Sequence, residues 1–305
     1  MFEAWLEILR ETTGTDHHKK YSSFWNNKIK RRIGRVKIGA LTEQHLQDII
    51  NAEYKNGLAK KSLENLRACM VSFVKYARKC KATVLLPENL TIPKGAAVGE
   101  KIILQPDDMR LLFSCDSSTL REKEVFEPLV YAWRLQVLTG LRPGELLGLR
   151  WSDIDLKGKV IGIKQSINGH NEITTGKNDN AQRVFALTDE AQRQIIEYKS
   201  KLPKSIVISE YIFPDPEGDF LSQSSNLKRW TRYKKHNGIN PAVTLYGLRH
   251  TFVSIFKGLP EGYLKAIVGH SIKMDTYRTY GHAFEGDLEQ AATLMQERLK
   301  DVLGK

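Results

Sequence analysis

Two arginines, a histidine and a tyrosine lie in the sequence where they could bind and attack an anion. Arg142 stands in an apolar setting just after a glycine, and Arg249 lies between two apolar side chains. An arginine in an apolar pattern needs an anionic partner, because an unpaired charge is costly to remove from water. His270 follows a glycine at the end of an apolar run, and Tyr280 comes ten residues later beside another glycine. Each of these residues alone is more often structural, so the prediction rests on their order and spacing.

Two further charged residues support such a site. Glu145 comes three residues after Arg142, at the start of a helical turn, and is placed to hold that arginine. Lys177 lies in a polar stretch between two strand patterns, residues 160–165 and 183–187, so we expect it near the tip of a β-hairpin. A lysine at a hairpin tip is by itself usually only hydrated.

The composition is that of an ordinary globular protein with a strong positive charge. Of the 305 residues, 41% are hydrophobic and 27% are charged, and the formal net charge is +12. This charge indicates a polyanionic partner, with nucleic acid first and an anionic membrane surface second. The sequence also has no apolar run of the ~18 residues that a membrane span needs. Between the two partners we expect nucleic acid and no membrane. The three cysteines lack metal-ligand or disulfide spacing, which favours a reducing cytosol.

The first part of the chain has the pattern of a small helical module. Apolar residues recur at helical spacing in residues 2–9, 42–50 and 63–79. Thr42 is placed as the N-cap of the second of these helices, and Ser62 as the residue that opens the third. We expect a four-helix module that ends near residue 86.

This module also carries a basic run. Residues 17–37 contain eight Lys or Arg and no acidic residue, with aromatic residues among them. A run of one sign favours a surface that follows a phosphate backbone, although basic runs also occur on ordinary surfaces. We therefore expect residues 1–86 to form a DNA-binding domain with the following contact residues: Lys19, Lys20, Lys28, Lys30, Arg31, Arg32, Arg35, Lys60, Lys61 and Arg67.

A linker and a larger second domain follow. Residues 87–104 carry prolines and glycines that break both helix and strand. A proline and two aspartates then start a helix at residue 106, because proline suits the first turn and carboxylates suit the positive end of the helix dipole. We place the second domain in residues 105–305.

The second domain is predicted to be mainly α-helical with a small antiparallel β-sheet. The strands are accompanied by a hairpin turn at Asn168 and Gly169. A terminal amphipathic helix, residues 284–303, must bury its apolar stripe either on its own domain or on a neighbouring protomer. The other helical patterns cover residues 125–139, 191–201, 226–235 and 263–268.

The order of these motifs resembles the catalytic domain of the tyrosine recombinases, the family of phage and conjugative-transposon integrases. The resemblance covers residues 104 to about 284, and the first module is similar to that family's core-site-binding domain. The motifs are T-G-L-R-P-G-E, the hairpin lysine, L-R-H-T, V-G-H-S and T-Y-G-H. The family usually has His or Lys three residues before the second arginine. Here that position is Tyr246, whose phenol can donate a hydrogen bond but carries no positive charge.

The resemblance implies roles for five further residues. Arg142 and Arg249 would hold the scissile phosphate, because arginine forks match the geometry of phosphate oxygens. His270 would donate a further hydrogen bond. Tyr280 would attack phosphorus, which gives a 3′-phosphotyrosyl link and frees a 5′-hydroxyl, and Lys177 would protonate that leaving oxygen.

The implied function is that of a site-specific recombinase. Such an integrase breaks and rejoins DNA for the integration or excision of a mobile element. Because the covalent link stores the bond energy, we expect no ATP, metal or other cofactor. The sequence contains neither a G-x-x-x-x-G-K-[ST] loop nor a carboxylate–histidine cluster. Two alternatives remain: a type IB topoisomerase-like enzyme, which shares most of these residues, and a catalytically silent DNA-binding protein.

The resemblance also implies partners. We expect double-stranded DNA with core recombination sites, further copies of the chain in an active tetramer, and accessory DNA-bending or directionality factors. The expected location is on DNA in the cytoplasm, for a bacterial or phage-encoded protein. Some relatives carry an arm-binding domain before the core-binding module, so the chain either lacks that domain or has been cut.

Overall fold

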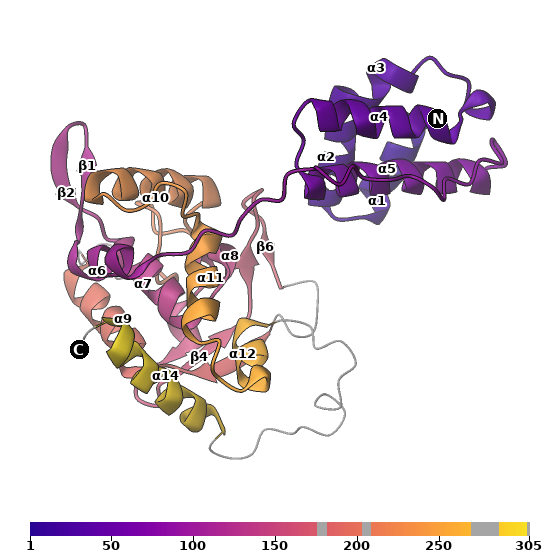
Figure 1. Ribbon diagram of the computed structural model, residues 1–305. Helices are drawn as coiled ribbons and strands as arrows, with labels where there is room; N and C mark the ends of the chain where they lie inside the picture. Colours follow the sequence, from indigo (N-terminus) through magenta and orange to yellow (C-terminus); the bar gives the residue numbers. More distant parts are fainter. Residues whose placement is uncertain (176–181, 203–208, 270–286, 304–305) are drawn as a thin grey trace. The chain divides into compact units, whose positions relative to one another are not determined.

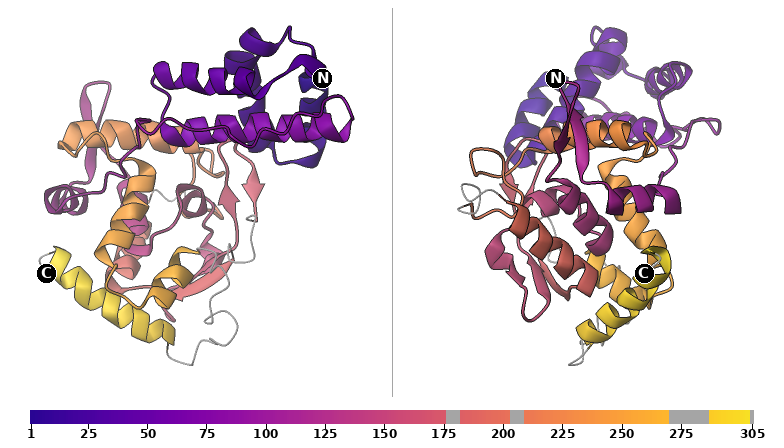
Figure 2. Two further views of the ribbon diagram at one scale, coloured as in Figure 1. Left: turned by 45° about the vertical axis from the view of Figure 1, so that its right-hand side comes forward. Right: turned by 90° about the vertical axis from the view of Figure 1, so that its left-hand side faces the viewer.

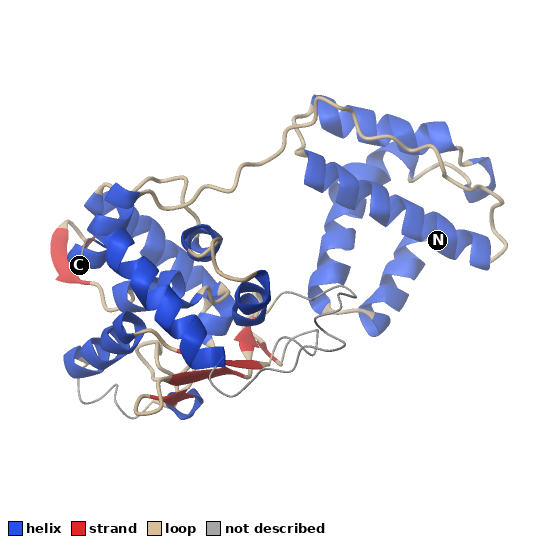
Figure 3. Cartoon of the chain, turned by 60° about the horizontal axis from the view of Figure 1, so that its bottom comes forward, coloured by secondary structure: helices blue, strands red, loops and turns tan. Residues whose placement is uncertain are grey.

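The computed structural model of the chain describes residues 1–175, 182–202, 209–269 and 287–303 (Figure 1). The chain divides into two compact units, Met1–Glu100 and Lys101–Lys305. Helices dominate both units, and the described strands are short, antiparallel and confined to the second (Figure 3). The predicted fold class, mainly α with a small antiparallel β-sheet, is confirmed. Within the described ranges, no helix has both the length and the apolar character needed to cross a bilayer.

The first unit is a helical bundle around an aromatic core. The Phe2 ring stacks on Trp25 at a centroid distance of 4.3 Å and lies 4.4 Å from the Phe73 ring. Its elements are α1 (Phe2–Thr12), α2 (Thr15–Phe24), the π-helical turn η1 (Trp25–Ile29), α3 (Lys30–Ile33), the 3-10 turn η2 (Ile38–Ala40), α4 (Glu43–Lys55) and α5 (Lys60–Lys79).

The two predicted helix starts in this unit have different outcomes. Thr42 caps α4 as predicted, and its side chain accepts a hydrogen bond from the His45 backbone N–H. The prediction that Ser62 opens α5 is wrong, because this helix begins at Lys60. The Lys60 N–H donates to the Ala97 carbonyl at 2.8 Å. A partner far along the chain therefore satisfies a backbone donor of the first turn, which local sequence does not reveal.

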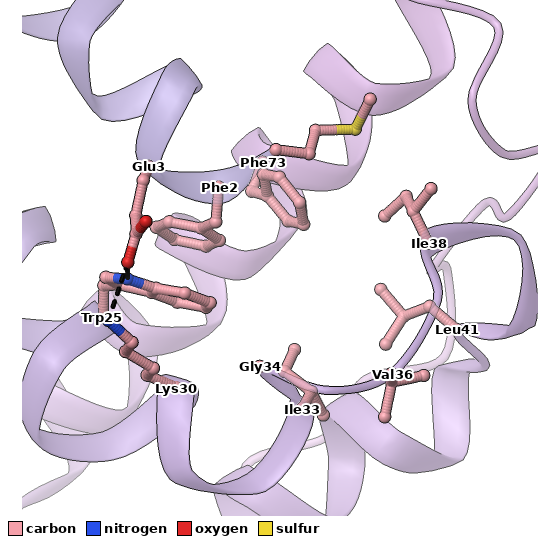
Figure 4. Close-up of a pocket in the computed structure, with 11 residues that line it drawn as sticks. Phe2, Glu3, Trp25, Lys30, Ile33, Gly34, Val36, Ile38, Leu41 and Phe73 are labelled. Carbon is pink, nitrogen blue, oxygen red and sulfur yellow. Dashed lines mark hydrogen bonds and ion pairs between the residues drawn. The ribbon is translucent and has the colours of Figure 1, made fainter.

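The basic run is helical and is fixed to α1. Residues 17–33 of the run lie in α2, η1 and α3 without an intervening loop, and residues 34–37 form the turn that follows α3. The Glu3 carboxylate accepts hydrogen bonds from the Trp25 indole at 3.2 Å and from the Lys30 ammonium at 2.7 Å. Figure 4 shows these side chains at one side of a pocket of about 470 Å³, with Phe73 and Leu41 also on its wall. Glu3 thus connects Lys30, one member of the basic run, to α1.

The segment predicted as a linker is shared between the two cores. Leu90 and Ala96 are buried in the core of the first unit, whereas Leu104 is buried in that of the second. The Leu104 N–H donates to the Thr251 hydroxyl at 2.9 Å.

The second unit is built around one buried helix. Every residue of α7 (Val130–Thr139) is buried, and α9 (Asp189–Lys201) and α11 (Leu245–Ile255) pack against it. The predicted helix 125–139 is wrong at its start, since residues 125 and 126 belong to a strand. Pro128 disfavours helical backbone in the residue before it, so the helix begins only at Val130. The other helices are α6 (Pro106–Ser114), α8 (Pro143–Leu147), α9 (Asp189–Lys201), α10 (Gln223–Asn237), α11 (Leu245–Ile255), α12 (Glu261–Val268), α14 (Asp287–Leu303) and the 3-10 turn η3 (Trp151–Asp153).

The strands form three small sheets. Strand β4 lies between β3 and β7 in the largest, and the Asn168–Gly169 turn lies between β5 and β6. Strand β4 ends at Ile163, two residues earlier than predicted. Lys177 lies outside the described residues. The strands are β1 (Ser117–Leu120), β2 (Lys123–Phe126), β3 (Ile154–Asp155), β4 (Val160–Ile163), β5 (Ser166–Ile167), β6 (Ile173–Thr174) and β7 (Arg183–Ala186).

The terminal helix α14 packs on its own unit. Met295 and Leu299 are buried in the core of the second unit, and the helix contacts β7 and α6 (Figure 2). The Asp189 N–H also donates to the Gln296 amide oxygen at 3.0 Å. The sequence left open whether the apolar stripe packs on its own domain or on a neighbouring protomer, and in the structure it packs on its own domain.

Candidate anion-binding site

Arg142 stands at the turn between α7 and α8. Helix α7 ends at Thr139 and is capped by Gly140, whose φ of 66° is a left-handed conformation that glycine adopts readily. Arg142 is the N-cap of α8, and the buried Glu145 accepts a hydrogen bond from its backbone N–H at 2.8 Å and from its Nη1 at 2.6 Å. Glu145 therefore fixes both the backbone and the side chain of Arg142. The Arg142 side chain remains 33% exposed.

A second arginine, which the sequence analysis missed, holds the same carboxylate. Arg183 begins β7, and its Nη1 and Nη2 donate to the two Glu145 oxygens at 3.1 and 2.8 Å. Its side chain is only 7% exposed. The signal that marked Arg142 and Arg249 was present here too, because Arg183 opens an apolar strand pattern.

Arg249 lies on α11 and is buried. Its Nη1 donates to the Gly140 carbonyl at 2.7 Å and its Nη2 to the Val268 carbonyl at 2.6 Å. The backbone turn after α7 and the end of α12 therefore aim this guanidinium.

All three arginines meet the C-terminal end of α12. The carbonyls of Ile267, Val268 and Gly269 accept hydrogen bonds from Arg183 (2.6 Å), Arg249 (2.6 Å) and Arg142 (3.2 Å), respectively. The last carbonyls of a helix lack partners within the helix and carry its partial negative charge, so cations are stabilised there. The end of α12 thus gathers the three guanidinium groups.

This cluster has more positive than negative charge. Burial alone would raise the pKa of Glu145, but the hydrogen bonds and charges of Arg183 and Arg142 hold that pKa below its ordinary value. Burial, followed by the charge of Arg142, lowers the pKa of Arg249 to about 10, which still leaves it protonated at neutral pH. Three arginines against one carboxylate leave an excess of two positive charges. Such a site favours a phosphate, which arginine binds in a forked geometry.

The other predicted site residues are placed differently. Tyr246 lies on α11 one helical turn before Arg249 and is 53% exposed. His270 and Tyr280 lie outside the described residues, but His270 directly follows Gly269 in the chain. Across the described ranges, His, Cys, Asp and Glu side chains form no group of three or more that could hold a metal ion.

The predicted DNA-contact residues of the first unit are mostly exposed, but several are engaged within the protein. The buried Glu53 accepts from Lys28 at 2.6 Å and from Arg31 at 3.0 Å, and Arg67 donates to the Leu90 carbonyl at 3.1 Å. The eight exposed members are Lys19, Lys20, Lys30, Arg31, Arg32, Arg35, Lys60 and Lys61. The basic run is therefore partly balanced by acidic residues from other helices.

Comparison with known proteins gives consistent matches. A model of the phage integrase family matches residues 104–286. A tyrosine recombinase XerC-like protein of Caldanaerobacter subterraneus subsp. tengcongensis is 23% identical over 316 residues, which cover 92% of this chain and 78% of that protein. The integrase of Staphylococcus phage L54a is 26% identical over 325 residues, which cover 93% of this chain and 88% of the integrase.

Two solved structures have the same fold as the chain. The Tn1549 transposon integrase in complex with circular intermediate DNA has a TM-score of 0.71 and 18% sequence identity, and the match covers 95% of this chain and 97% of that one. A lambda integrase tetramer bound to a Holliday junction has a TM-score of 0.67 and 18% identity, with 90% of this chain and 77% of that one covered.

Proposed function

The chain belongs to the phage integrase family and is a tyrosine recombinase, and we propose which of its residues break and rejoin DNA. The enzyme is a site-specific recombinase that acts through a 3′-phosphotyrosyl intermediate and serves the integration or excision of a mobile element. The observation that carries the assignment of residues is the arginine cluster on the end of α12, where Arg142, Arg183 and Arg249 donate to the carbonyls of Gly269, Ile267 and Val268, respectively.

The scissile phosphate binds Arg142 and Arg249. Arg142 is partly exposed, and its Nη1 and Nη2 are held by Glu145 and by the Gly269 carbonyl. Arg249 is more deeply buried, so water screens its charge less. As the tyrosine attacks, negative charge develops on the non-bridging oxygens of the phosphate. Guanidinium groups that are already fixed stabilise that charge without reorganisation.

The bond changes follow from the matched motifs. The Tyr280 phenol releases its proton to water as its oxygen forms a bond to phosphorus and the bond from phosphorus to the 5′ oxygen breaks. Lys177 gives a proton to that leaving oxygen, and His270 donates a hydrogen bond to the phosphate. Attack by the 5′-hydroxyl of another strand reverses these steps and releases the tyrosine. Neither direction consumes ATP, because the phosphotyrosyl link conserves the energy of the broken bond.

Tyr246 takes the place of the His or Lys found in relatives. It lies one turn before Arg249 on the same helix and is 53% exposed, so its hydroxyl is accessible to DNA. We assign it one hydrogen bond to a non-bridging oxygen. A phenol is neutral near pH 7, so this contact adds less charge stabilisation than a lysine would.

The first unit binds the DNA of the core site. The exposed lysines and arginines along α2, α3, the turn after α3 and the start of α5 supply contacts to the phosphate backbone. Lys28 serves mainly to position its neighbours, because the buried Glu53 holds it. The charge of +12 supports this assignment.

The active form is a tetramer on paired core sites. A lambda integrase of the same fold was solved as a tetramer on a Holliday junction. We place this action on DNA in the bacterial cytoplasm, since the relatives come from a bacterium and a bacteriophage. Accessory DNA-bending or directionality factors complete the assembly.

The test compares two arginines in cleavage of a suicide DNA substrate. Arg142→Ala should lower the rate of adduct formation at least ~10²-fold, the usual cost of one fixed charge-stabilising donor. The matched control is Arg150→Ala, because Arg150 is also 33% exposed and also pairs with a glutamate. The control should cleave normally. Equal rates for the two variants would remove Arg142 from the site.

A further inference from the structure

We propose that Arg183 is a positioning residue of the recombination reaction, which fixes Glu145, and through it Arg142, against the end of α12. This inference rests on the proposed function, because it gives Arg183 a part in the same reaction.

The first support is the bonding of the Glu145 carboxylate. Its Oε1 accepts from Arg142 Nη1 at 2.6 Å and from Arg183 Nη1 at 3.1 Å. Its Oε2 accepts from the Arg142 backbone N–H and from Arg183 Nη2, both at 2.8 Å. Two of these four hydrogen bonds come from Arg183. Without Arg183, the buried carboxylate could rotate, and Arg142 would lose its fixed support.

The second support is that Arg183 links three separate elements. It lies at the start of β7, forms an ion pair with Glu145 on α8, and donates a hydrogen bond from Nε to the Ile267 carbonyl on α12 at 2.6 Å. In the chain, it comes six residues after Lys177, and Ile267 comes three residues before His270. The side chain therefore ties Arg142 to the helix that leads into the next motif.

The third support is the charge of the site. Glu145 attracts Arg142, and a phosphate competes with Glu145 for the same guanidinium. Arg183 shares the glutamate charge, so Arg142 is held without being neutralised by it. Loss of Arg183 would reduce the excess positive charge from two to one. At 7% exposure and with each of its three nitrogens donating to protein oxygens, Arg183 itself acts through Glu145 rather than on the phosphate.

The experiment measures single-turnover cleavage of a suicide DNA substrate at saturating protein, together with the Kd for the same DNA. Arg183→Gln should cleave about 10- to 100-fold more slowly, because a small misplacement of a reacting group has an effect of this size. Its Kd should change less than about 3-fold, because many other basic residues contact the backbone. Arg183→Lys keeps the charge but cannot form the fork, so it should also be slow.

Two controls separate positioning from a general loss of structure. Arg134→Gln removes another buried arginine, which pairs with Asp116 at 2.6 Å and donates to the Leu112 carbonyl at 2.7 Å. It should lower the melting temperature to a similar extent and leave the cleavage rate at saturating protein unchanged. In a Glu145→Gln background, Arg183→Gln should slow cleavage less than about 3-fold further, because its partner is already lost.

The outcomes distinguish this inference from the proposed function. A wild-type chain that forms no covalent adduct would overturn the proposed function. If the wild-type chain cleaves, and Arg183→Gln and Arg183→Lys both cleave at the wild-type rate, the role of Arg183 alone is overturned. Fully multiplicative losses in the Glu145→Gln pair would overturn it as well.

Discussion

Replacement of Gly140 by alanine tests how the turn after α7 aims Arg249. Gly140 has a φ of +66°, and a Cβ built there would lie 2.4 Å from Cδ1 of the buried Phe252. The Gly140 carbonyl accepts the hydrogen bond from Arg249 Nη1 at 2.7 Å, and Phe252 lies on the same helix as Arg249. The added methyl group therefore pushes on α11, and α11 also carries Arg249, which the carbonyl of residue 140 holds.

The magnitude follows from two contributions. Left-handed backbone costs alanine about 1 kcal/mol, and forcing a methyl group into a packed core costs about 1–3 kcal/mol. Gly140→Ala should thus lower the free energy of unfolding of this unit by about 2–4 kcal/mol. The control is Gly238→Ala, because Gly238 has a φ of +69° but nothing within 4 Å of the added Cβ. It should cost only the backbone contribution of about 1 kcal/mol.

Amide hydrogen exchange in peptides from α7 and α11, read by mass spectrometry, measures these costs, and a suicide substrate measures cleavage. Gly140→Ala should reduce the cleavage rate about 10²-fold, whereas Gly238→Ala should leave it unchanged. Equal losses of unfolding free energy in the two variants would show that contact with Phe252 does not restrict the side chain at position 140. Normal cleavage by a destabilised Gly140→Ala variant would refute the claim that this turn aims Arg249.

Three further predictions follow from other contacts. The pKa of Glu145 is held below its ordinary value of 4.5, so its contribution to stability is full above that value and is lost as pH falls through the folded-state pKa. Glu145→Gln should therefore melt earlier at neutral pH and lose less stability between pH 5 and 3; an unchanged pH slope would contradict this. Met295→Ala should destabilise the second unit by about 2–5 kcal/mol in thermal unfolding, because Met295 is buried in its core; an unchanged melting temperature would indicate that α14 packs elsewhere. Arg35→Ala should weaken DNA binding and reduce the slope of log K against log salt concentration by about 1. Lys28→Ala, which loses a contact to Glu53, should leave this slope nearly unchanged; equal slopes for the two variants would contradict the assignment of Arg35 as a phosphate contact and of Lys28 as a positioning residue.

Sequence patterns were most informative where partners are close in the chain. Glu145 lies three residues from Arg142, so the spacing alone suggested their contact. Arg183 reaches the same carboxylate across 38 residues, and no local pattern predicts which acid a distant arginine will meet. For the same reason, the sequence did not reveal the acidic partner of the basic run in the first unit. Its partner Glu53 lies 25 residues beyond Lys28 on another helix.

Helix boundaries show the same limit. The start of α6 at Pro106 and the cap at Thr42 depend on neighbouring residues and were predicted correctly. The start of α5 depends on the Ala97 carbonyl, which lies 37 residues after Lys60 in the chain. Periodicity located the apolar stripe of α14, but which surface covers that stripe is decided by tertiary packing.

The most direct test of the central claim is to identify the residue that becomes bonded to DNA. The wild-type chain is incubated in excess EDTA with a suicide substrate, the denatured adduct is digested, and mass spectrometry locates the attached nucleotide. We predict a 3′-phosphate bound to Tyr280 and a free 5′-hydroxyl on the released strand, with no adduct from Tyr280→Phe despite normal DNA binding. An adduct on Tyr277, a 5′-phosphate linkage, or cleavage that requires Mg²⁺ would contradict it.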